Sequence, residues 1–281
     1  MSFDDITVVI NTFYSDDKIT NCLNSIPNTL KIIVIENSSR NDFKLQIEKK
    51  YPNVKCYLTG QNLGYAKGNN FGLSKVNTNY ALILNPDAKL EDQTINNFLI
   101  SASKVKDFAI IGPGKQDEFD KNKYSFPNNE LFEVNYLKGF AMFLNLKEFE
   151  EIGYFDENFF IYLEETDLCK RIKIKNKRIF LDCNIKVSHI GGKSHSNNID
   201  YEMELSRNWH WMWSKFYFNK KYYGFIYALI STSGNLFSAI IKVFWHFILF
   251  NKKERKIYFQ RLSGLINSIL GKKSWYRPAL D

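Results

Sequence analysis

A polar segment, Asn85, Pro86 and Asp87, comes directly after the short apolar run YALIL at residues 80–84. A carboxylate in such a loop can bind Mg²⁺ or Mn²⁺ while phosphate oxygens of a substrate and water fill the remaining ligand positions. Asn-Pro-Asp is also a common turn sequence, so by itself the segment indicates a turn more readily than a metal site. Its neighbours in the sequence decide between these two interpretations.

Three carboxylates, those of Glu164, Glu165 and Asp167, lie within four consecutive residues at the expected start of a helix. Acidic residues at a helix start interact favourably with the helix dipole, which is one explanation of the cluster. The other explanation is catalytic, because a partly desolvated carboxylate can accept a proton from an attacking hydroxyl group. The aromatic run GYFDENFFIY, residues 153–162, precedes the cluster and would suit the apolar face of a sugar ring.

His189, in the sequence VSHIGGKSH, stands at the end of an expected strand and is followed by two glycines. A single histidine at such a position is more often structural than functional, but an imidazole is also a common metal ligand. The residues alone leave both roles open. In the functional role, His189 would be a second metal ligand beside Asp87.

The elements that position these residues alternate between strand and helix in the first half of the chain. This pattern predicts an α/β fold with a mostly parallel central sheet flanked by helices. Apolar β-branched runs and helical spacing of apolar residues give the expected elements. The expected strands are residues 6–10, 31–36, 54–58, 80–84, 136–145 and 185–190. The expected helices are residues 18–26, 43–51 and 164–175, with another that follows a Gly- and Asn-rich turn at 62–70 and ends near residue 76.

Ligands of an open α/β sheet bind at the carboxyl ends of its strands, where the connecting loops converge. Residues 12–14, 36–39 and 85–87 follow three of the expected strands directly. We therefore expect these three loops to lie together and to form part of a ligand site.

The C-terminal region, residues 207–281, is expected to form a helical appendage to a first domain of residues 1–206. Its most apolar stretch, residues 223–250, is long enough to span a bilayer. Apolar and polar residues fall on opposite sides of the expected helix, however, and such a helix lies in a membrane interface more readily than across it. Packing of the helix on the body of the protein or on a partner is the other alternative.

The net charge of +8 is unevenly distributed along the chain. Residues 207–281 carry 13 Lys or Arg and two acidic residues, a net charge of +11, whereas residues 1–206 carry 25 basic and 28 acidic residues, a net charge of −3. Because the basic residues of the tail are interleaved with aromatic and aliphatic ones, we expect them to meet an anionic membrane surface rather than a nucleic acid. The four cysteines lack metal-ligand spacing and the N-terminus lacks a basic signal segment. We therefore expect a cytoplasmic protein, peripheral on the inner face of the cytoplasmic membrane.

Seven segments occur in the order VVINTFY, IVIENSSRND, NLGYAKGNNFGL, LILNPDA, YLKGFAMFL, GYFDENFFIYLEETDLCKR and VSHIGGKSH. Each is unspecific alone, but in this order over residues 5–215 the chain resembles glycosyltransferase family 2, particularly its bacterial rhamnosyltransferase-like members. The resemblance implies the GT-A fold, and it favours the metal-binding interpretation of Asn85, Pro86 and Asp87.

The resemblance also implies roles for single residues. Thr12 and Tyr14 would line the nucleotide base, with Glu36 at its edge. Asp87, with His189 nearby, would bind Mg²⁺ or Mn²⁺, and Glu165 would be the catalytic base. The remaining nucleotide-sugar contacts would come from Asn62, Gly64, Lys67, Asn70 and Asn85. The acceptor or sugar side would be formed by Glu164, Asp167 and Gly139.

Two positions depart from the family's pattern. The family usually has E-D-x-D where this chain has the sequence EETD at residues 164–167, and it usually has Asp at the position of Glu36. A glutamate at position 165 is a competent base, but its extra methylene moves the carboxylate by about a bond length, and a displacement of about 1 Å can cost roughly 10²-fold in rate. We expect the site to be adjusted around the longer side chain.

The resemblance implies an inverting, metal-dependent glycosyltransferase that uses a nucleoside diphosphate donor and a saccharide or lipid-linked saccharide acceptor in cell-surface polysaccharide synthesis. dTDP-L-rhamnose is the expected donor, with UDP-hexoses and a galactofuranose donor as alternatives. A sugar-nucleotide pyrophosphorylase would need a glycine-rich, basic loop after its first strand, where this chain has the acidic sequence VVINTFYSDD. A membrane-attached protein that binds nucleotide-sugar or glycan without turnover is the non-enzymatic alternative.

Overall fold

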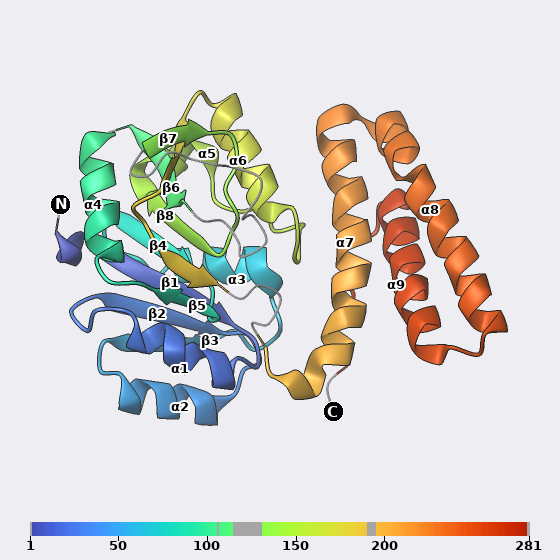
Figure 1. Ribbon diagram of the computed structural model, residues 1–281, viewed down its shortest axis with the longest axis horizontal. Coiled ribbons are helices and arrows are strands. Elements are labelled where there is room, and N and C mark those ends of the chain that lie inside the picture. The colour runs from blue at the N-terminus through green and yellow to red at the C-terminus, as the bar shows by residue number, and fades with distance from the viewer. Residues whose placement is uncertain (1, 106, 115–130, 190–194, 280–281) are drawn as a thin grey trace. The chain divides into compact units, whose positions relative to one another are not determined.

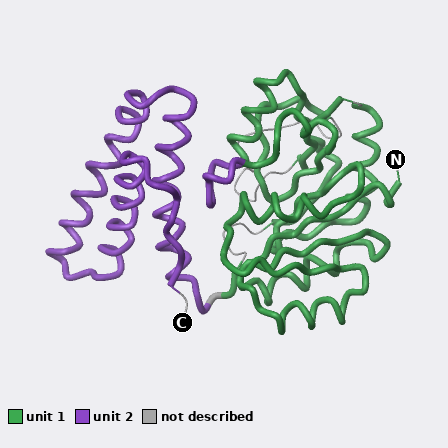
Figure 2. The backbone as a smooth tube through the Cα atoms, turned by 180° about the vertical axis from the view of Figure 1, so that it is seen from behind, with its two compact units in different colours: residues 1–155, 165–196 green, residues 156–164, 197–281 purple. Residues whose placement is uncertain are grey.

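The computed structural model describes residues 2–105, 107–114, 131–189 and 195–279. The chain divides into two compact units (Figure 2), unit 1 with residues 1–155 and 165–196 and unit 2 with residues 156–164 and 197–281. The expected boundary after residue 206 falls inside helix α7 (Asp200–Tyr223), which runs through it without a break.

Unit 1 is built on an eight-stranded sheet of order β3-β2-β1-β4-β8-β6-β9-β7 (Figure 1). Its strands are β1 (Ile6–Thr12), β2 (Lys31–Glu36), β3 (Val54–Leu58), β4 (Tyr80–Leu84), β6 (Phe108–Pro113), β7 (Leu131–Val134), β8 (Ala141–Asn145) and β9 (Arg178–Asp182). β1 to β4 run parallel to one another, β8 runs antiparallel to β4 and β6, and β7 runs antiparallel to β9. The expected α/β fold with a mostly parallel sheet is confirmed.

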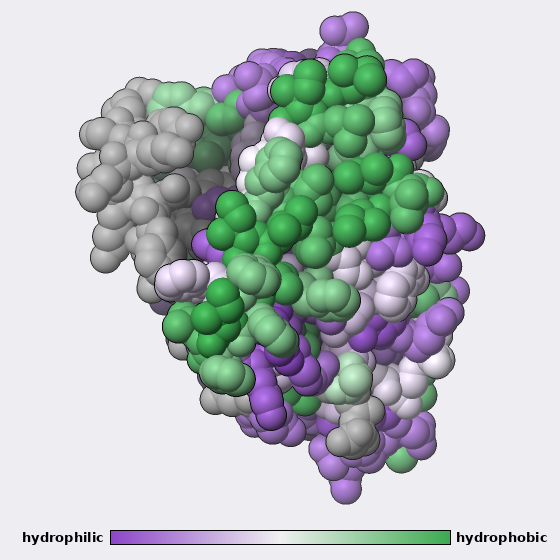
Figure 3. Space-filling model, turned by 90° about the vertical axis from the view of Figure 1, so that its right-hand side faces the viewer, coloured by the Kyte–Doolittle hydropathy of each residue, from purple (hydrophilic) through white to green (hydrophobic). Residues whose placement is uncertain are grey.

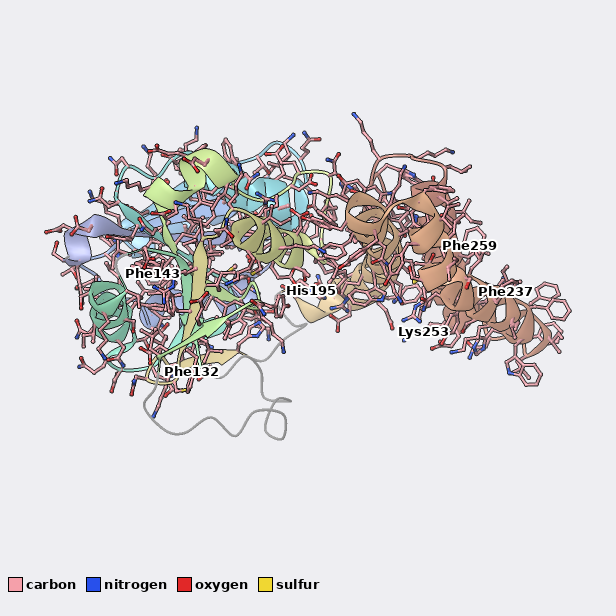
Figure 4. The ribbon with its side chains drawn as sticks, turned by 90° about the horizontal axis from the view of Figure 1, so that it is seen from above. Phe132, Phe143, His195, Phe237, Lys253 and Phe259 are labelled. Atoms are coloured by element: carbon pink, nitrogen blue, oxygen red, sulfur yellow. The ribbon has the colours of Figure 1, made fainter. Side chains whose placement is uncertain are left out.

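Helices cover this sheet (Figure 1). Among the described residues before 197, the helices are α1 (Asp16–Asn24), α2 (Asn41–Lys50), α3 (Gly64–Leu73), α4 (Thr94–Lys104), α5 (Phe149–Ile152) and α6 (Glu164–Ile174), with short 3-10 helices at Phe3–Asp5 and Leu146–Glu148. Because parallel strands are covered on both faces, β1 and β2 are nearly continuous apolar runs. Phe143 of β8 lies in the core (Figure 4), where its ring stacks on Phe98 of α4 with centroids 5.1 Å apart.

The expected strands at residues 31–36, 54–58 and 80–84 are confirmed at both ends, and the strand expected at residues 6–10 continues to Thr12. The expected helices are confirmed with shifts of a few residues at their ends. These agreements follow from burial, since each of these strands is an unbroken or nearly unbroken apolar run.

The strand expected at residues 136–145 begins only at Ala141, so that prediction was wrong for its first half. Gly139 lies in the turn before β8. Its carbonyl accepts a hydrogen bond from the hydroxyl group of Tyr65, a contact between distant segments that a local sequence pattern does not encode.

β10 (Val187–His189) does not join the main sheet and instead pairs antiparallel with β5 (Ala88–Leu90). The register of this ladder sets His189 opposite Ala88. The strand expected at residues 185–190 begins only at Val187, and residue 190 and the two glycines that follow it lie outside the described residues.

Unit 2 is a bundle of the helices α7, α8 (Phe225–Ile248) and α9 (Lys252–Ile269), preceded by a 3-10 helix at Asn197–Ile199. The helices α7 and α9 approach closely because Gly264 has no side chain: a Cβ there would lie 2.1 Å from the carbonyl oxygen of Trp209. The expected helical appendage is confirmed. Its small core consists of Met212, Phe216, Ala228 and Leu265.

Residues 156–164 belong to unit 2 through their contacts with α7. The hydroxyl group of Ser214 donates to the carbonyl of Ile161 at 3.0 Å, and the rings of Phe160 and His210 stack with centroids 4.4 Å apart. Phe160 is 7% exposed. Part of the aromatic run that precedes the acidic cluster is thus used to pack against a helix.

Candidate active site

The β5–β10 ladder brings Asp87 and His189 together. His189 Nε2 lies 3.4 Å from Asp87 Oδ1, and the two side chains are 11% and 1% exposed. Asp87 stands in a turn closed by a 3.0 Å hydrogen bond from the Ala88 amide to the Asn85 carbonyl, with Pro86 at the position that this residue favours in such turns. The turn and metal-site interpretations are therefore compatible, since the turn is what presents the carboxylate.

The imidazole of His189 lies flat against the ring of Phe140. The two centroids are 4.5 Å apart and the ring planes differ by 4°. The carbonyl of Phe140 also accepts a 2.8 Å hydrogen bond from the amide of Asn85. Phe140 thus orients His189 through its ring and fixes the turn that carries Asp87 through its backbone. Sequence reasoning missed this residue, because a buried aromatic residue beside a strand is typical of a core.

Both carboxylate oxygens of Asp87 are buried, and neither has a hydrogen-bond partner among the residues that the structure describes. Such a burial is costly unless a cation compensates the charge. A carboxylate oxygen and an imidazole nitrogen both bind Mn²⁺, and carboxylates also bind Mg²⁺. The described residues contain no group of three or more His, Cys, Asp or Glu that could hold a metal ion. Asp87 and His189 therefore fit an ion whose other ligands come from a substrate and water.

Cys22 of α1 lies beside the turn that carries Asp87. Burial, and then the charge of Asp87, raise the pKa of the Cys22 thiol, which donates to the carbonyl of Asn85 at 3.5 Å. Cys22 is therefore a neutral neighbour of the Asp87 site.

Glu36, at the end of β2, is 1% exposed and is bonded to its own loop. Its carboxylate accepts hydrogen bonds from the amides of Ser38 at 3.2 Å and Arg40 at 2.7 Å, and from the Ser38 hydroxyl group. The length of a glutamate side chain lets it reach the amide four residues later, which gives a structural reason for the departure from aspartate. Contact of Glu36 with a nucleotide base stays a prediction.

Thr12 and Tyr14 lie at the end of β1, next to this loop. The Thr12 hydroxyl group donates to the carbonyl of Ile35 at 3.1 Å, so its side chain links β1 to β2 inside the sheet. Tyr14 has a positive φ of 49°, and the Arg40 guanidinium carbon lies 5.0 Å from its ring centroid. Non-glycine residues held in this costly conformation cluster at ligand sites. Tyr14 thus presents a half-buried ring held in place at the sheet edge.

Two asparagines that sequence reasoning did not assign tie the strand ends to the expected closing segment. Asn37 Nδ2 donates to Asn11 Oδ1 at 2.6 Å and to the carbonyl of Gly64 at 3.1 Å. Asn11 Nδ2 donates to the same carbonyl at 3.0 Å. A Cβ at Gly68 would lie 2.4 Å from Asn11 Nδ2, so this amide network requires glycine there. The position of both asparagines at the ends of adjacent buried strands was the signal that could have revealed them.

The other residues of the closing segment have different environments. Asn62 Oδ1 accepts the amide of Gly64 at 3.0 Å, in a turn that begins α3. Lys67 is exposed on α3. Asn70 bonds both backbone groups of Phe155, at 2.9 and 3.0 Å, and so fixes the chain ahead of the acidic cluster. Contacts of these residues with a nucleotide-sugar stay predictions.

Glu165 lies half-buried in the first turn of α6. Its Oε1 accepts hydrogen bonds from the hydroxyl groups of Tyr136 at 3.1 Å and Thr166 at 3.4 Å. Burial raises the pKa of Glu165, and these hydrogen bonds lower it in part. A carboxylate in this state is a stronger proton acceptor than a fully solvated one.

Gly139 lies between Tyr65 and Glu165. A Cβ at Gly139 would lie 2.9 Å from the Tyr65 hydroxyl oxygen and 3.6 Å from Glu165 Cβ. The next residue, Phe140, contacts His189. The dipeptide Gly139–Phe140 therefore connects the Glu165 side of the site with the Asp87 side.

Asp167 is fully buried and accepts a 2.8 Å hydrogen bond from Arg171 Nε. Arg171 in turn donates to the carbonyls of Ile152 and Gly153, at 2.7 and 3.1 Å. This arrangement anchors α6. Glu164 is 4% exposed, so Glu165 is the carboxylate of the cluster that is not fully buried.

A family model described as "Glycosyl transferase family 2" matches residues 7–180. The chain belongs to this family. The match spans β1 to β9, and so includes Asp87, Gly139 and Glu165, while His189 follows it closely.

Three curated glycosyltransferases are similar to this chain in sequence over part of their length. The low-salt glycan biosynthesis hexosyltransferase Agl10 of Haloferax volcanii is 27% identical over 199 residues, which cover 63% of this chain and 64% of the relative. The N-acetylglucosaminyl-diphospho-decaprenol L-rhamnosyltransferase of Mycobacterium tuberculosis is 23% identical over 187 residues, covering 51% and 61%. Rhamnosyltransferase WbbL of Escherichia coli is 23% identical over 226 residues, covering 69% and 83%. The chain spans less than two thirds of the length of the first two relatives.

Solved structures show the same GT-A fold. The mannosyltransferase PcManGT from Pyrobaculum calidifontis, in complex with GDP-Man and Mn²⁺, has a TM-score of 0.58 at 12% identity, over 96% of this chain and 88% of that one. S. aureus TarS 1-349 in complex with UDP-GlcNAc has a TM-score of 0.54 at 16% identity, over 97% and 93% of the two chains.

Proposed function

We propose that this protein is a metal-dependent, inverting glycosyltransferase that transfers a sugar from a nucleoside diphosphate donor to a saccharide or lipid-linked saccharide in cell-surface polysaccharide synthesis. The observation that carries the proposal is the placement of Asp87 and His189 on one side of Gly139–Phe140 and of Glu165 on the other. A cation that stabilises the leaving diphosphate and a base that accepts the hydroxyl proton both assist the displacement of a diphosphate by a hydroxyl group.

Asp87 and His189 would hold the Mg²⁺ or Mn²⁺ ion on the donor side. Such an ion neutralises the charge that develops on a leaving diphosphate. The protein's own part is orientation: the ladder register sets the two side chains facing each other, and the ring of Phe140 keeps the imidazole in one plane. The buried carboxylate oxygens of Asp87, which have no hydrogen-bond partner among the described residues, support this assignment.

Glu165 would accept the proton of the acceptor hydroxyl group on the other side. The hydroxyl oxygen attacks the anomeric carbon from the face opposite the diphosphate, and the bond from that carbon to the diphosphate oxygen breaks with its electron pair leaving on the oxygen. The configuration at the anomeric carbon inverts. The raised pKa of Glu165 supports this role, because it increases the affinity of the carboxylate for the proton.

The proposed donor is dTDP-L-rhamnose. It is supported by the similarity of this chain to two rhamnosyltransferases. A hexose donor is the second candidate, since Agl10 is a hexosyltransferase and the structure of TarS holds UDP-GlcNAc. A lipid-linked acceptor is favoured by the mycobacterial relative, whose name pairs L-rhamnose transfer with N-acetylglucosaminyl-diphospho-decaprenol.

The test is transfer by the purified full chain with Mn²⁺, a panel of dTDP-L-rhamnose and UDP-hexoses, and lipid-linked saccharides as acceptors. We expect release of nucleoside diphosphate from one donor, dependent on the metal, and a product whose anomeric configuration is opposite to that of the donor by NMR. Glu165→Gln should lose most turnover. Retention of configuration would contradict the inverting mechanism. Donor binding without turnover across the whole panel would contradict the proposed activity and favour a binding protein.

A further inference from the structure

Helix α8 exposes a continuous row of large apolar side chains, here called the α8 apolar face. In Figure 3 apolar side chains gather over the side of the molecule that α8 forms, and in Figure 4 Phe237 lies at the outer side of the bundle. Monomeric soluble proteins rarely expose apolar patches larger than about a few hundred Å². The face consists of Ile226, Ile230, Phe237, Ile241, Phe244 and Ile248, each between 51% and 70% exposed.

The side of α8 that the bundle covers carries small and polar residues beside Leu229 and Leu236. Ser231 Oγ accepts a 2.9 Å hydrogen bond from Asn219, and Asn235 Oδ1 accepts a 2.8 Å hydrogen bond from Lys215. Thr232, which is 1% exposed, is covered on the same side. A helix that turns its largest apolar side chains away from its own bundle is oriented oppositely to a surface helix of a soluble protein, so the medium that it meets is apolar.

The last turn of α8 and the link from α8 to α9 add exposed aromatic side chains next to this face. Trp245 and Phe247 are 57% and 58% exposed. Phe250, in the turn itself, is 89% exposed and has a positive φ of 52°. The positive φ belongs to the cap that ends α8, in which the Asn251 amide donates to the carbonyl of His246 at 3.0 Å, and the cap leaves the Phe250 ring exposed.

Basic side chains follow this turn at once. Lys252, Lys253 and Lys256 are exposed at the start of α9, and Arg255 lies over the ring of Phe247, 5.5 Å from its centroid. The region from residue 207 onward has a net charge of +11. Apolar and aromatic groups flanked by cations match the layered chemistry of an anionic bilayer, with acyl chains beneath phosphate groups.

We propose that the α8 apolar face and the basic start of α9 form a docking surface for an anionic membrane, with α8 lying in the plane of the interface. α8 is long and apolar enough to cross a bilayer, but its Lys242 is exposed and donates to the Tyr258 hydroxyl group of α9 at 3.1 Å. Its polar side is also bonded to α7. A crossing helix would carry these polar and cationic partners into the hydrocarbon core, whereas an interfacial helix leaves them in water.

The test is co-sedimentation of the full chain with vesicles, which needs no sugar transfer and therefore fails or succeeds independently of the proposed enzymatic function. Vesicles of phosphatidylcholine are compared with vesicles that contain phosphatidylglycerol, at low and at high salt. We expect binding to the anionic vesicles that weakens as salt rises, because the phosphate charges are then screened. Equal binding to both kinds of vesicle would overturn the basic half of the surface, and binding to neither would overturn the whole proposal.

Two pairs of variants separate the apolar and basic contributions. Phe237→Glu with Phe244→Glu should lower vesicle affinity at least tenfold, whereas the matched control Leu45→Glu with Ile100→Glu, on exposed apolar residues of unit 1, should not. Lys252→Glu with Lys253→Glu should lower it by about fivefold for each charge removed, or more because the sign is reversed. Lys49→Glu with Lys104→Glu, on exposed lysines of unit 1, is the control for charge. All eight side chains are exposed, so circular dichroism should show that the variants are folded. If the control variants lose as much vesicle affinity as the variants of the docking surface, the assignment of the surface is overturned.

Two other occupants of the face give distinct results. If a second copy of this chain covers it, light scattering will show a dimer that Phe237→Glu with Phe244→Glu converts to a monomer, without vesicle binding. If α8 crosses the bilayer, alkaline carbonate will fail to release the protein from membranes. Either result would overturn interfacial docking.

Discussion

His189 Nε2 lies 3.4 Å from Asp87 Oδ1, and the two side chains meet because β10 pairs with β5 in the register that sets His189 opposite Ala88. A shift of this ladder by one residue would turn the His189 side chain to the other face of the strand. The proposed metal site thus depends on a short ladder outside the main sheet rather than on a local motif.

Asp87→Asn tests the metal site while keeping the shape of the side chain. Mn²⁺ together with UDP or dTDP should raise the melting temperature of the wild type, with a stabilisation of about 2.7 kcal/mol at a ligand concentration a hundred times the Kd. The variant should show no such shift, and without ligand it should be no less stable, because a buried charge has been removed. Asp92→Asn, at an exposed carboxylate close in the chain, is the control and should behave as the wild type.

Phe140→Leu tests whether the stacked ring orients His189. Loss of the ring should weaken Mn²⁺ binding by about tenfold, in the range found when groups that orient a metal ligand are removed. The cost in stability should be about 1 kcal/mol. Phe143→Leu is the matched control, since Phe143 is also buried and stacked on a ring. If both variants lose Mn²⁺ affinity equally, Phe140 acts only through the core.

The parts of the fold that the sequence predicted well are those that local burial determines. β2, β3 and β4 begin and end as expected because each is a short apolar run between polar turns. Asp87 and Glu165 were predicted as site residues because each stands in a recognisable segment, and their roles stay predictions. The segment around Gly139 was wrongly predicted as strand. The hydrogen bond that its carbonyl accepts comes from Tyr65, which is distant in the sequence, so a local pattern could not reveal it.

The residues that sequence reasoning missed act through tertiary contacts. Asn11 and Asn37 hold a carbonyl of the closing segment, and neither partner can be inferred from spacing. Phe140 has the composition of a core residue, and only the ladder that brings His189 onto its ring gives it another role. Tyr136 was expected to begin a strand, and its bond to Glu165 depends on the fold of both segments.

Tyr136→Phe tests the environment of the proposed base. The hydrogen bond from Tyr136 lowers the pKa of Glu165, so its removal should raise that pKa further. Because the base must be deprotonated, the acidic limb of the pH profile of kcat/KM should move to higher pH, while the rate well above the limb changes little. Tyr57→Phe, at a half-buried tyrosine elsewhere in unit 1, should leave the profile unchanged. A limb that moves to lower pH would contradict the assignment.

Glu165→Gln should lower kcat by about 10²- to 10⁴-fold, the usual contribution of a general base. It should also stabilise the protein at neutral pH. The folded-state pKa of Glu165 is raised by burial, so the charged form costs folding free energy at pH values above the folded pKa. As the pH falls through the folded and then the unfolded pKa, the carboxyl group becomes neutral in both states and the cost disappears. Urea unfolding at several pH values checks this, and a variant that is less stable at neutral pH would contradict it.

Gly68→Ala tests the amide network that holds the closing segment. An added Cβ would lie 2.4 Å from Asn11 Nδ2, so either α3 shifts or Asn11 leaves the carbonyl of Gly64. We expect a loss of about 1–3 kcal/mol in stability, as for other overpacked sites, and a higher KM for the donor with a smaller change in kcat. Gly234→Ala in α8 is the control, since a Cβ there meets no atom within 4 Å, and removing a helix glycine should stabilise by about 0.5–1 kcal/mol. A Gly68→Ala variant with an unchanged KM would show that the segment does not contact the donor.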